Sequence, residues 1–264
     1  MAVNNEVKRV DSGTFDFPEY DIPEHLIERI KRINFNNCYH IAITGTIGAG
    51  KTTRCAYLYQ LMQKAGKNTK DYPEYLAMDE AASNLLKKRI DGVISPNTFQ
   101  NYVCDIWDYN LKNKTDHDIC IYERAPDDCL TCFANLANKN NEISDIDLLS
   151  MFNRMKSISI TGNIPSYFDQ STHLSVMEAN EIENNVTDIL DIIENDISNG
   201  IYKRIIGLSV PYEVSIERIS IRNRNGEENY PKKLIYEYNE HYTKLYNFMI
   251  KNKRLDRFVD LGLL

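Results

Sequence analysis

Long hydrophobic runs are missing from this sequence of 264 residues, and no apolar stretch approaches the ~18 residues of a membrane-spanning helix. The first residues also lack the basic and apolar blocks of a signal peptide. These absences predict an intracellular, cytoplasmic protein that does not use a membrane as a partner. The 42% hydrophobic and 26% charged residues are typical of a globular chain, and the length corresponds to one large domain or two small ones.

Cysteine and basic residues are also limited. Six cysteines lie mostly within apolar segments, which predicts reduced core thiols and not a disulfide framework. Cys129 and Cys132 form a C-x-x-C pair, but no second pair of Cys or His lies at the spacing of zinc ligands. The net charge of -7 argues against a nucleic-acid polymer or an anionic membrane as a partner. Any bound phosphate therefore requires a local cluster of Lys and Arg.

Strand and helix patterns alternate along the chain, without internal repeats. Compact apolar runs predict strands at 39–44, 118–122, 204–210 and 257–261, with a weaker candidate just before Asp71. Apolar residues at helical spacing predict helices at 51–65, 97–111, 128–137, 144–155 and 232–251. Pro211 marks the first position of one more helix. This alternation is typical of a parallel α/β sheet.

Two segments differ in composition from the rest of the chain. Residues 1–36 are polar and interrupted by proline, and we expect them to form an N-terminal extension packed on a main domain at 37–264. Residues 159–199 are acidic and rich in Asn, and we expect an insertion there with one helical pattern from Val186 to Ile197.

A glycine-rich segment at 45–52 has the pattern G-x-x-x-x-G-K-[ST] between a predicted strand and a predicted helix. Gly45, Gly48 and Gly50 let backbone N–H groups turn toward phosphate oxygens, and the helix directs its positive dipole end at them. Lys51 can reach the β- and γ-phosphates, and Thr52 can bind Mg²⁺. The segment therefore predicts a nucleotide-binding loop. The alternative interpretation is a plain glycine turn between a strand and a helix.

This loop alone leaves three classes open: a GTP-dependent switch, an ATP-hydrolysing module and a phosphoryl transferase acting on a small molecule. Residues 113–116 spell N-K-x-D, the guanine-reading pattern of GTPases. However, that pattern should follow a strand, whereas here it joins a helix to a strand, and no D-x-x-G is suitably placed. We therefore interpret 113–116 as a polar loop.

Three further segments carry charges where α/β sheets bind ligands. Glu74 follows the weaker strand candidate and is a possible general base, or else a solvated surface residue. Glu123 and Arg124 directly follow a buried strand, where they suit a metal ion and a transferring phosphoryl group, or else a structural ion pair. The last segment is a basic run after the strand at 204–210, which is a possible phosphate lid or a solvated helix face and contains Arg218, Arg222 and Arg224.

Taken together, these motifs resemble the deoxynucleoside kinases, which include cellular deoxycytidine, deoxyguanosine and mitochondrial thymidine kinases, insect deoxynucleoside kinase and, more distantly, herpesvirus thymidine kinase. The resemblance covers roughly Tyr39 to Met249. Its motifs are the phosphate loop at 45–53, the strand-end Glu74, F-Q-x-Y at 99–102, E-R at 123–124 and the arginine run followed by two acids at 218–228. It implies a P-loop kinase fold, with a five-stranded parallel sheet, helices on both faces and an arginine-rich lid at about 218–230.

The resemblance also implies how a deoxynucleoside is bound. Glu74 would take the proton from the sugar 5′-OH, and Arg124 would orient that hydroxyl and stabilise the phosphoryl group. Gln100 would form paired hydrogen bonds with the base, Phe133 would stack on it, and Glu228 would hold the sugar 3′-OH.

Binding of the phosphate donor follows from the same resemblance. ATP would lie on the loop from Gly45 to Thr53, with Thr52 and Glu123 holding Mg²⁺. The donor phosphates would be neutralised by Lys51 and by the lid residues Arg218, Arg222 and Arg224. Members of the family usually dimerise through helices equivalent to those at 97–111 and 144–155, so a homodimer is expected.

Several positions depart from the family or bear on the choice of base. Trp107 and Cys129 stand where a charged Arg/Asp pair accompanies cytidine and purine acceptance, so we expect a pyrimidine, thymidine first; alternatively, Trp107 is simply core. Arg89 replaces a sugar-binding Tyr, which places the sugar contact in question. Other departures are Asp79 for a pocket Trp, Tyr75 for Pro and Ala125 for Ser.

The expected function is therefore ATP-dependent phosphorylation of a deoxynucleoside at its 5′-OH, which yields the 5′-monophosphate and ADP in nucleotide salvage. One alternative enzyme is a nucleoside monophosphate kinase such as thymidylate kinase, which shares the loop and the lid. A non-enzymatic alternative is a nucleotide-binding regulatory module.

Overall fold

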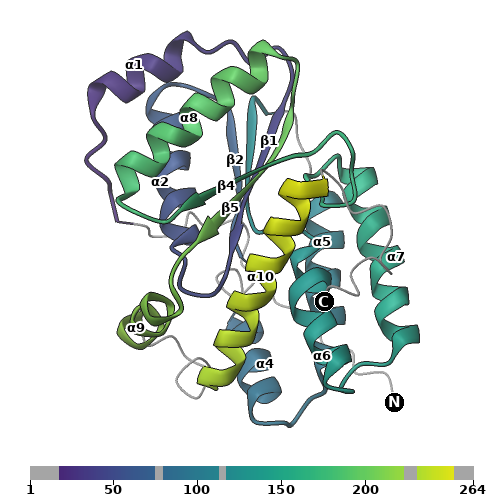
Figure 1. Cartoon of the computed structure of the whole chain (residues 1–264). Coiled ribbons are helices and arrows are strands. Elements are labelled where there is room, and N and C mark those ends of the chain that lie inside the picture. Colours follow the sequence, from purple (N-terminus) through teal and green to yellow (C-terminus); the bar gives the residue numbers. More distant parts are fainter. Residues whose placement is uncertain (1–17, 75–79, 113–116, 223–230, 253–264) are drawn as a thin grey trace.

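The computed structural model describes residues 18–74, 80–112, 117–222 and 231–252. Its centre is a five-stranded sheet in the order β2-β3-β1-β5-β4, and every neighbouring pair is parallel. The strands are β1 (Tyr39–Gly45), β2 (Thr69–Tyr72), β3 (Ile119–Glu123), β4 (His173–Glu178) and β5 (Lys203–Ser209). The expected parallel α/β sheet is thus confirmed (Figure 1).

One strand of the described sheet is not predicted from the sequence. The predicted strand at 257–261 lies outside the described residues, and β4 arises instead from the acidic segment at 159–199. β4 is an edge strand whose six residues are half-buried or exposed, so its sequence shows no buried apolar run. The helical pattern in the same segment corresponds to α8 (Ile182–Ser198).

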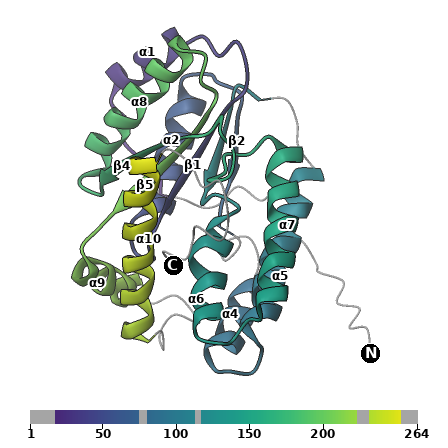
Figure 2. The same ribbon diagram turned by 45° about the vertical axis from the view of Figure 1, so that its right-hand side comes forward.

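Helices cover both faces of the sheet, as Figures 1 and 2 show. Because side chains alternate along a strand, β1 directs Ile41 and Ile43 toward one face and Ala42 toward the other. The first face packs against α1 (Glu24–Arg32), α2 (Lys51–Lys64) and α8. The second packs against α5 (Pro96–Lys112), α7 (Asp145–Gly162) and α10 (Lys232–Asn252). Apolar residues of α1 belong to the same core cluster as those of α2 and β1.

The remaining helices lie around the carboxyl ends of the strands. They are α4 (Glu80–Ile90), α6 (Asn135–Lys139) and α9 (Tyr212–Arg222). The helix predicted at 128–137 begins as a π-helical turn at Cys129–Ala134, which runs directly into α6. A π turn contains one more residue than an α-helical turn. It therefore changes the directions in which the side chains of this segment point.

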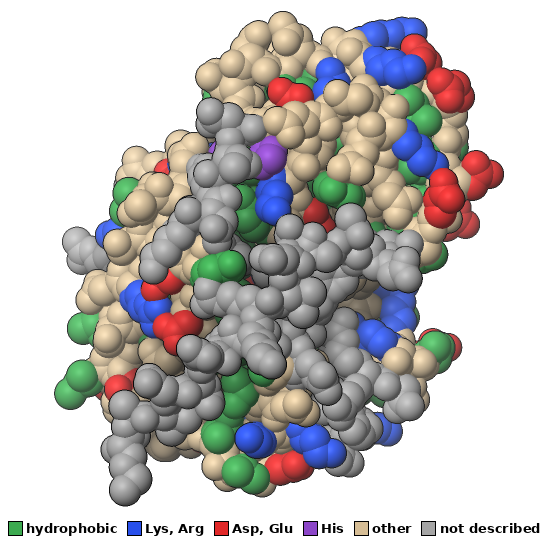
Figure 3. Space-filling view, turned by 180° about the vertical axis from the view of Figure 1, so that it is seen from behind, with side chains coloured by type: hydrophobic (Ala, Val, Ile, Leu, Met, Phe, Trp, Pro, Cys, Tyr) green, Lys and Arg blue, Asp and Glu red, His purple; other side chains and the backbone are tan. Residues whose placement is uncertain are grey.

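The surface of the described residues carries charges of both signs. On the side that Figure 3 shows, Lys and Arg are interspersed with Asp and Glu. Among these residues no helix is long and apolar enough to cross a bilayer. No disulfide joins the six cysteines, of which Cys38 is half-buried and the others are buried.

Candidate functional site

The phosphate loop lies between β1, which ends at Gly45, and α2, which begins at Lys51. Gly48 and Gly50 have φ angles of 80° and 82°, in the left-handed region that favours glycine. A Cβ atom at Gly48 would also lie only 2.9 Å from the carbonyl oxygen of Ser215 in α9. Glycine is therefore needed at position 48 for both the turn and the packing of the loop, and at position 50 for the turn.

Lys51 is buried at the start of α2, and its Nζ donates to the carbonyl oxygen of Thr46 at 2.9 Å. Burial, followed by the positive charge of Arg124, lowers the pKa of Lys51 to about 8. A phosphate group bound at the loop would oppose this effect, because a nearby negative charge favours the ammonium form. Lys51 is thus a buried amine whose protonated form is favoured by an anionic partner.

Thr52 and Glu123 are brought together across the loop. The Thr52 hydroxyl donates to Glu123 Oε1 at 2.6 Å, and Glu123 Oε2 accepts from the backbone N–H of Glu74 at 3.3 Å. Burial, and next the negative charge of Glu74, raises the pKa of Glu123. A hydroxyl and a carboxylate oxygen side by side are hard ligands that fit Mg²⁺, whose charge would relieve the repulsion between the two carboxylates.

Arg124 is fixed by three acceptors at the carboxyl end of β3. Its Nε donates to Glu74 Oε1 at 2.8 Å, and one terminal nitrogen donates to the Gly45 carbonyl at 2.8 Å and to the Tyr242 hydroxyl at 2.6 Å. Its backbone φ is 79°, which is rare for a residue with a side chain and is concentrated at functional sites. The fold thus holds a buried Glu–Arg pair beside the phosphate loop.

The Glu74 and Arg124 side chains line a cavity of about 370 Å³, together with Lys51. Gln100 and Phe133 line the same cavity, from α5 and the π turn respectively. Gln100 is buried, and its Oε1 atom has no hydrogen-bond partner within the described part of the chain. Such an acceptor is costly to bury unless a ligand satisfies it. The wall of the cavity therefore contains both an unsatisfied amide oxygen and the Glu–Arg pair.

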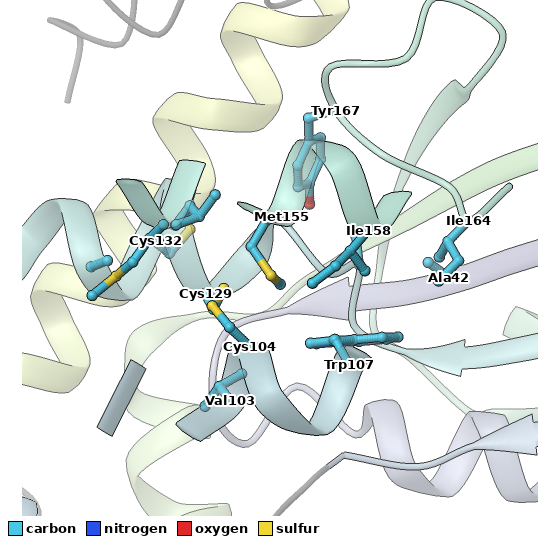
Figure 4. Packing of buried hydrophobic residues seen from close by; sticks show 14 of the residues in the cluster. Ala42, Val103, Cys104, Trp107, Cys129, Cys132, Met155, Ile158, Ile164 and Tyr167 are labelled. Carbon is cyan, nitrogen blue, oxygen red and sulfur yellow. The ribbon is translucent and has the colours of Figure 1, made fainter. Parts of the chain in front are cut away.

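Trp107 and Cys129 line another, narrow space of about 20 Å³, to which Glu74, Arg124 and Phe133 also belong. Figure 4 shows Trp107 among the labelled core residues, below Ile158. The indole also packs at 6.1 Å from the ring of Tyr122. Trp107 is thus both a core residue and part of the lining of this narrow space.

A second cavity of about 620 Å³ opens on the other side of the loop. It is lined by Gly48, Gly50, Lys51, Thr52, Thr53, Arg54, Arg218, Arg222 and three residues at 180–182. Arg218 donates to the Gly48 carbonyl at 3.2 Å, and Arg222 lines both cavities. The predicted residues Arg224 and Glu228 lie outside the described residues, as do Tyr75, Asp79 and the loop at 113–116.

Two residues at the site were not predicted from the sequence. Tyr242 of α10 contacts Arg124, and Arg54 of α2 donates to the Gly50 carbonyl at 3.2 Å and to Asn185 at 2.8 Å. Arg54 has a sequence signal, since it lies one turn into the helix after the phosphate loop. Tyr242 has none, because its helix is distant in sequence and rich in tyrosine.

Three of the basic residues that line the cavity of about 370 Å³ are paired with acids of the same cavity. Arg124 is paired with Glu74 at 2.8 Å, and Arg89 with Glu142 at 2.7 Å. Lys233 and Glu237 lie 3.6 Å apart at its rim. The pairing neutralises the charge of these three residues, and the other described basic residues of the wall, Lys51 and Arg222, also line the second cavity beside Arg54 and Arg218.

Comparison with known proteins gives structural matches only. No protein-family model and no curated protein sequence matches the chain. Deoxyadenosine kinase from M. mycoides with bound dATP matches with a TM-score of 0.51 and 17% identity, over 81% of this chain and 87% of that one. The same kinase with bound dCTP matches with a TM-score of 0.51 and 16% identity, over 81% and 86% of the two chains.

At this level of identity the likeness concerns the fold. It agrees with the parallel sheet, the helices on both faces and the strand, loop and helix that form the phosphate loop. The fold expected from the sequence motifs is therefore confirmed, and the chain has the P-loop kinase fold that is also found in the M. mycoides deoxyadenosine kinase.

Proposed function

We propose that the protein is a deoxynucleoside kinase that transfers the γ-phosphoryl group of ATP to the 5′-OH of a deoxynucleoside in nucleotide salvage. The observation that carries this proposal is the position of the Glu74–Arg124 pair. It lies in the wall of a substrate-sized cavity that also contains Lys51 of the phosphate loop. A carboxylate, a guanidinium and a loop lysine at one junction are the groups that phosphoryl transfer to an alcohol requires.

Each group has a task that its surroundings support. Glu74 accepts the proton of the attacking hydroxyl, and its bond to Arg124 Nε holds the carboxylate in place. Arg124 stabilises the negative charge on the transferring group while its contacts with Gly45 and Tyr242 keep it rigid. When bound, Mg²⁺ would be held by Thr52 and Glu123 and would neutralise charge on the donor phosphates.

The pairing of Arg89 and Arg124 with acids favours a nucleoside over a nucleoside monophosphate as the acceptor. An acceptor that already carries a phosphate needs a cation that is free to bind it. Here the Arg89 and Arg124 guanidiniums are paired with Glu142 and Glu74. The donor phosphates would lie on the other side of the loop, beside Arg218 and Arg222.

A panel of acceptors tests the proposal. The purified protein is incubated with ATP and Mg²⁺ and with each deoxynucleoside or its 5′-monophosphate, and ADP formation is followed, with Lys51→Ala as the control. Turnover of deoxynucleosides that Lys51→Ala lacks supports the proposal. Turnover of monophosphates alone would identify a nucleoside monophosphate kinase, and binding of ATP without turnover of any acceptor would identify a regulatory module.

The choice of base is proposed to favour pyrimidines, with thymidine first. The space that Trp107 and Cys129 line together with Phe133 is only about 20 Å³, so the base would be confined to the main cavity. Replacing Trp107 by the smaller Met is expected to shift the ratio of kcat/KM for deoxyadenosine to that for thymidine upward by about tenfold or more. The ratio is measured by competition between the two substrates. An unchanged ratio in a folded variant would show that Trp107 packs the core and does not affect the choice of base.

Nucleotide binding is expected to weaken above pH 8. The pKa of Lys51 is lowered to about 8 without a ligand, and bound phosphates raise it, so affinity stays constant below pH 8. Above that value it falls by about tenfold per pH unit until the pKa of the complex is reached. Titrations with a fluorescent ATP analogue from pH 7 to 10 measure the affinity at each pH. Lys51→Arg should remove the dependence, and a flat wild-type profile would contradict it.

We further propose that two copies of the chain associate through α5 and α7. Exposed apolar residues are concentrated on α7, where Ile146, Leu149 and Ile160 are 81%, 54% and 67% exposed. Arg154 of α7 pairs with Asp105 of α5 at 2.6 Å, which fixes the two helices as one surface. A second copy would cover these apolar side chains.

The double variant Ile146→Glu/Ile160→Glu is expected to be a folded monomer. The side chains at positions 146 and 160 project into solvent, so we expect the fold to be retained. Repulsion between the glutamates of the two copies would oppose their association. Sedimentation at several concentrations measures the mass, and Val93→Glu, at a position that is 69% exposed outside α7, is the matched control. A monomeric wild-type protein would contradict the proposal.

A further inference from the structure

Two cysteines and a histidine gather at the amino-terminal end of the sheet, away from the phosphate loop. Cys38 immediately precedes β1, His40 is its second residue, and Cys120 is the partner of His40 in the register with β3. Residues two apart on a strand share a face, so the sheet places all three side chains on one side. The potential ligand atoms of Cys38, His40 and Cys120 all lie within 4.8 Å of one another.

The spacing of the two sulfur atoms suits a single tetrahedral ion. The Sγ atoms of Cys38 and Cys120 lie 3.6 Å apart. With Zn–S bonds of about 2.3 Å, two thiolates on one tetrahedral Zn²⁺ are separated by about 3.8 Å. The sulfur atoms are therefore close to the required separation without movement of the strands.

His40 is oriented by the residue beside it. Its Nδ1 atom lies 3.0 Å from the hydroxyl of Tyr122, and the two rings are nearly parallel with centroids 6.0 Å apart. The Tyr122 ring is itself stacked on Tyr72 at 4.6 Å. Metal-binding histidines are commonly held by such an outer contact, which fixes the ring without supplying a ligand to the ion.

We propose that Cys38, His40 and Cys120 form a binding site for Zn²⁺, with solvent as the fourth ligand. The two thiols each release a proton to solvent as their Zn–S bonds form, so the ion, two thiolates and a neutral imidazole carry no net charge. A neutral cluster suits the buried positions of His40 and Cys120. Cys38 is half-buried, and its open side is the path by which the ion enters.

This site would join the starts of β1 and β3. At their other ends, β1 leads into the phosphate loop and β3 ends at Glu123, next to Arg124. The site is therefore independent of the proposed kinase reaction. No C-x-x-C motif predicts it, because its ligands are distant in sequence and only the pairing of the strands brings them together.

Titration of the reduced, metal-free chain with Co²⁺ and then Zn²⁺ tests the proposal. Co²⁺ bound to thiolates gives a ligand-to-metal charge-transfer band, and Zn²⁺ should displace it at one ion per chain. Cys38→Ser and Cys38→Ala should each lose the band and bind Zn²⁺ at least tenfold more weakly. Cys104→Ala, which removes a buried thiol elsewhere on the same face of the sheet, should retain both.

Tyr122→Phe gives a second measurement that leaves all three ligands in place. Loss of the hydroxyl beside His40 is expected to lower Zn²⁺ affinity by about tenfold or more. Absence of a thiolate band in the wild-type protein, or equal Zn²⁺ binding by the wild-type protein and both Cys38 variants, would overturn the proposal.

Discussion

Replacement of Glu74 by glutamine is expected to lower kcat for deoxynucleoside phosphorylation by about 10²- to 10⁴-fold, the usual contribution of a general base. The amide has the shape of the carboxylate, and its oxygen can still accept from Arg124 Nε, where the wild-type distance is 2.8 Å. It cannot take the proton from the attacking hydroxyl. The chemical step should therefore slow while ATP still binds to the loop.

Steady-state kinetics of Glu74→Gln measure this effect, with Glu142→Gln as the matched control. Glu142 lines the same cavity and is paired with another arginine, Arg89, at 2.7 Å. It is not adjacent to the phosphate loop in the proposed reaction, so its variant should lose much less activity. A loss of less than tenfold in Glu74→Gln would remove Glu74 as the base.

Replacement of Arg124 by methionine is expected to abolish turnover and to lower the free energy of unfolding by about 3–5 kcal/mol. The side chains of Arg124 and Glu74 are only 7% and 9% exposed, so removal of the cation takes this ion pair away from a buried carboxylate. The Gly45 carbonyl and the Tyr242 hydroxyl lose a donor as well. Equilibrium unfolding in urea measures the change in free energy.

Arg89→Met is the matched control for this second variant. In the Arg89–Glu142 pair the side chains are 25% and 41% exposed, so solvent already screens much of the attraction. Its loss should lower the free energy of unfolding by about 1 kcal/mol or less. Equal destabilisation by the two variants would show that burial does not distinguish the pairs.

Much of the sheet can be predicted from the sequence because its central strands are buried on both faces. β1, β3 and β5 read as compact apolar runs, and the phosphate loop follows the first of them. β4 cannot be recognised in this way, because an edge strand that is half exposed needs no continuous apolar run. The π turn at Cys129–Ala134 is likewise hidden within an ordinary helical pattern.

The parts of the candidate site are visible in the sequence, whereas their contacts depend on the order of the strands. β2 pairs with β3 in the sheet. Glu74 follows β2 and Arg124 follows β3, so this pairing places the two side chains in contact. Neither the spacing of the motifs nor their residue types predicts that pairing. Tyr242 reaches Arg124 from a helix 118 residues further along the chain, and only the packing of α10 on the sheet reveals it.

Identification of the product formed from thymidine and ATP tests the central proposal most directly. The wild-type protein with Mg²⁺ and ATP labelled in its γ-phosphate should transfer the label to thymidine and give labelled thymidine 5′-monophosphate with one equivalent of ADP. Glu74→Gln, handled in parallel, should form this product at a small fraction of that rate. ADP and free phosphate without any labelled nucleotide product, for thymidine and every other deoxynucleoside, would contradict the proposal.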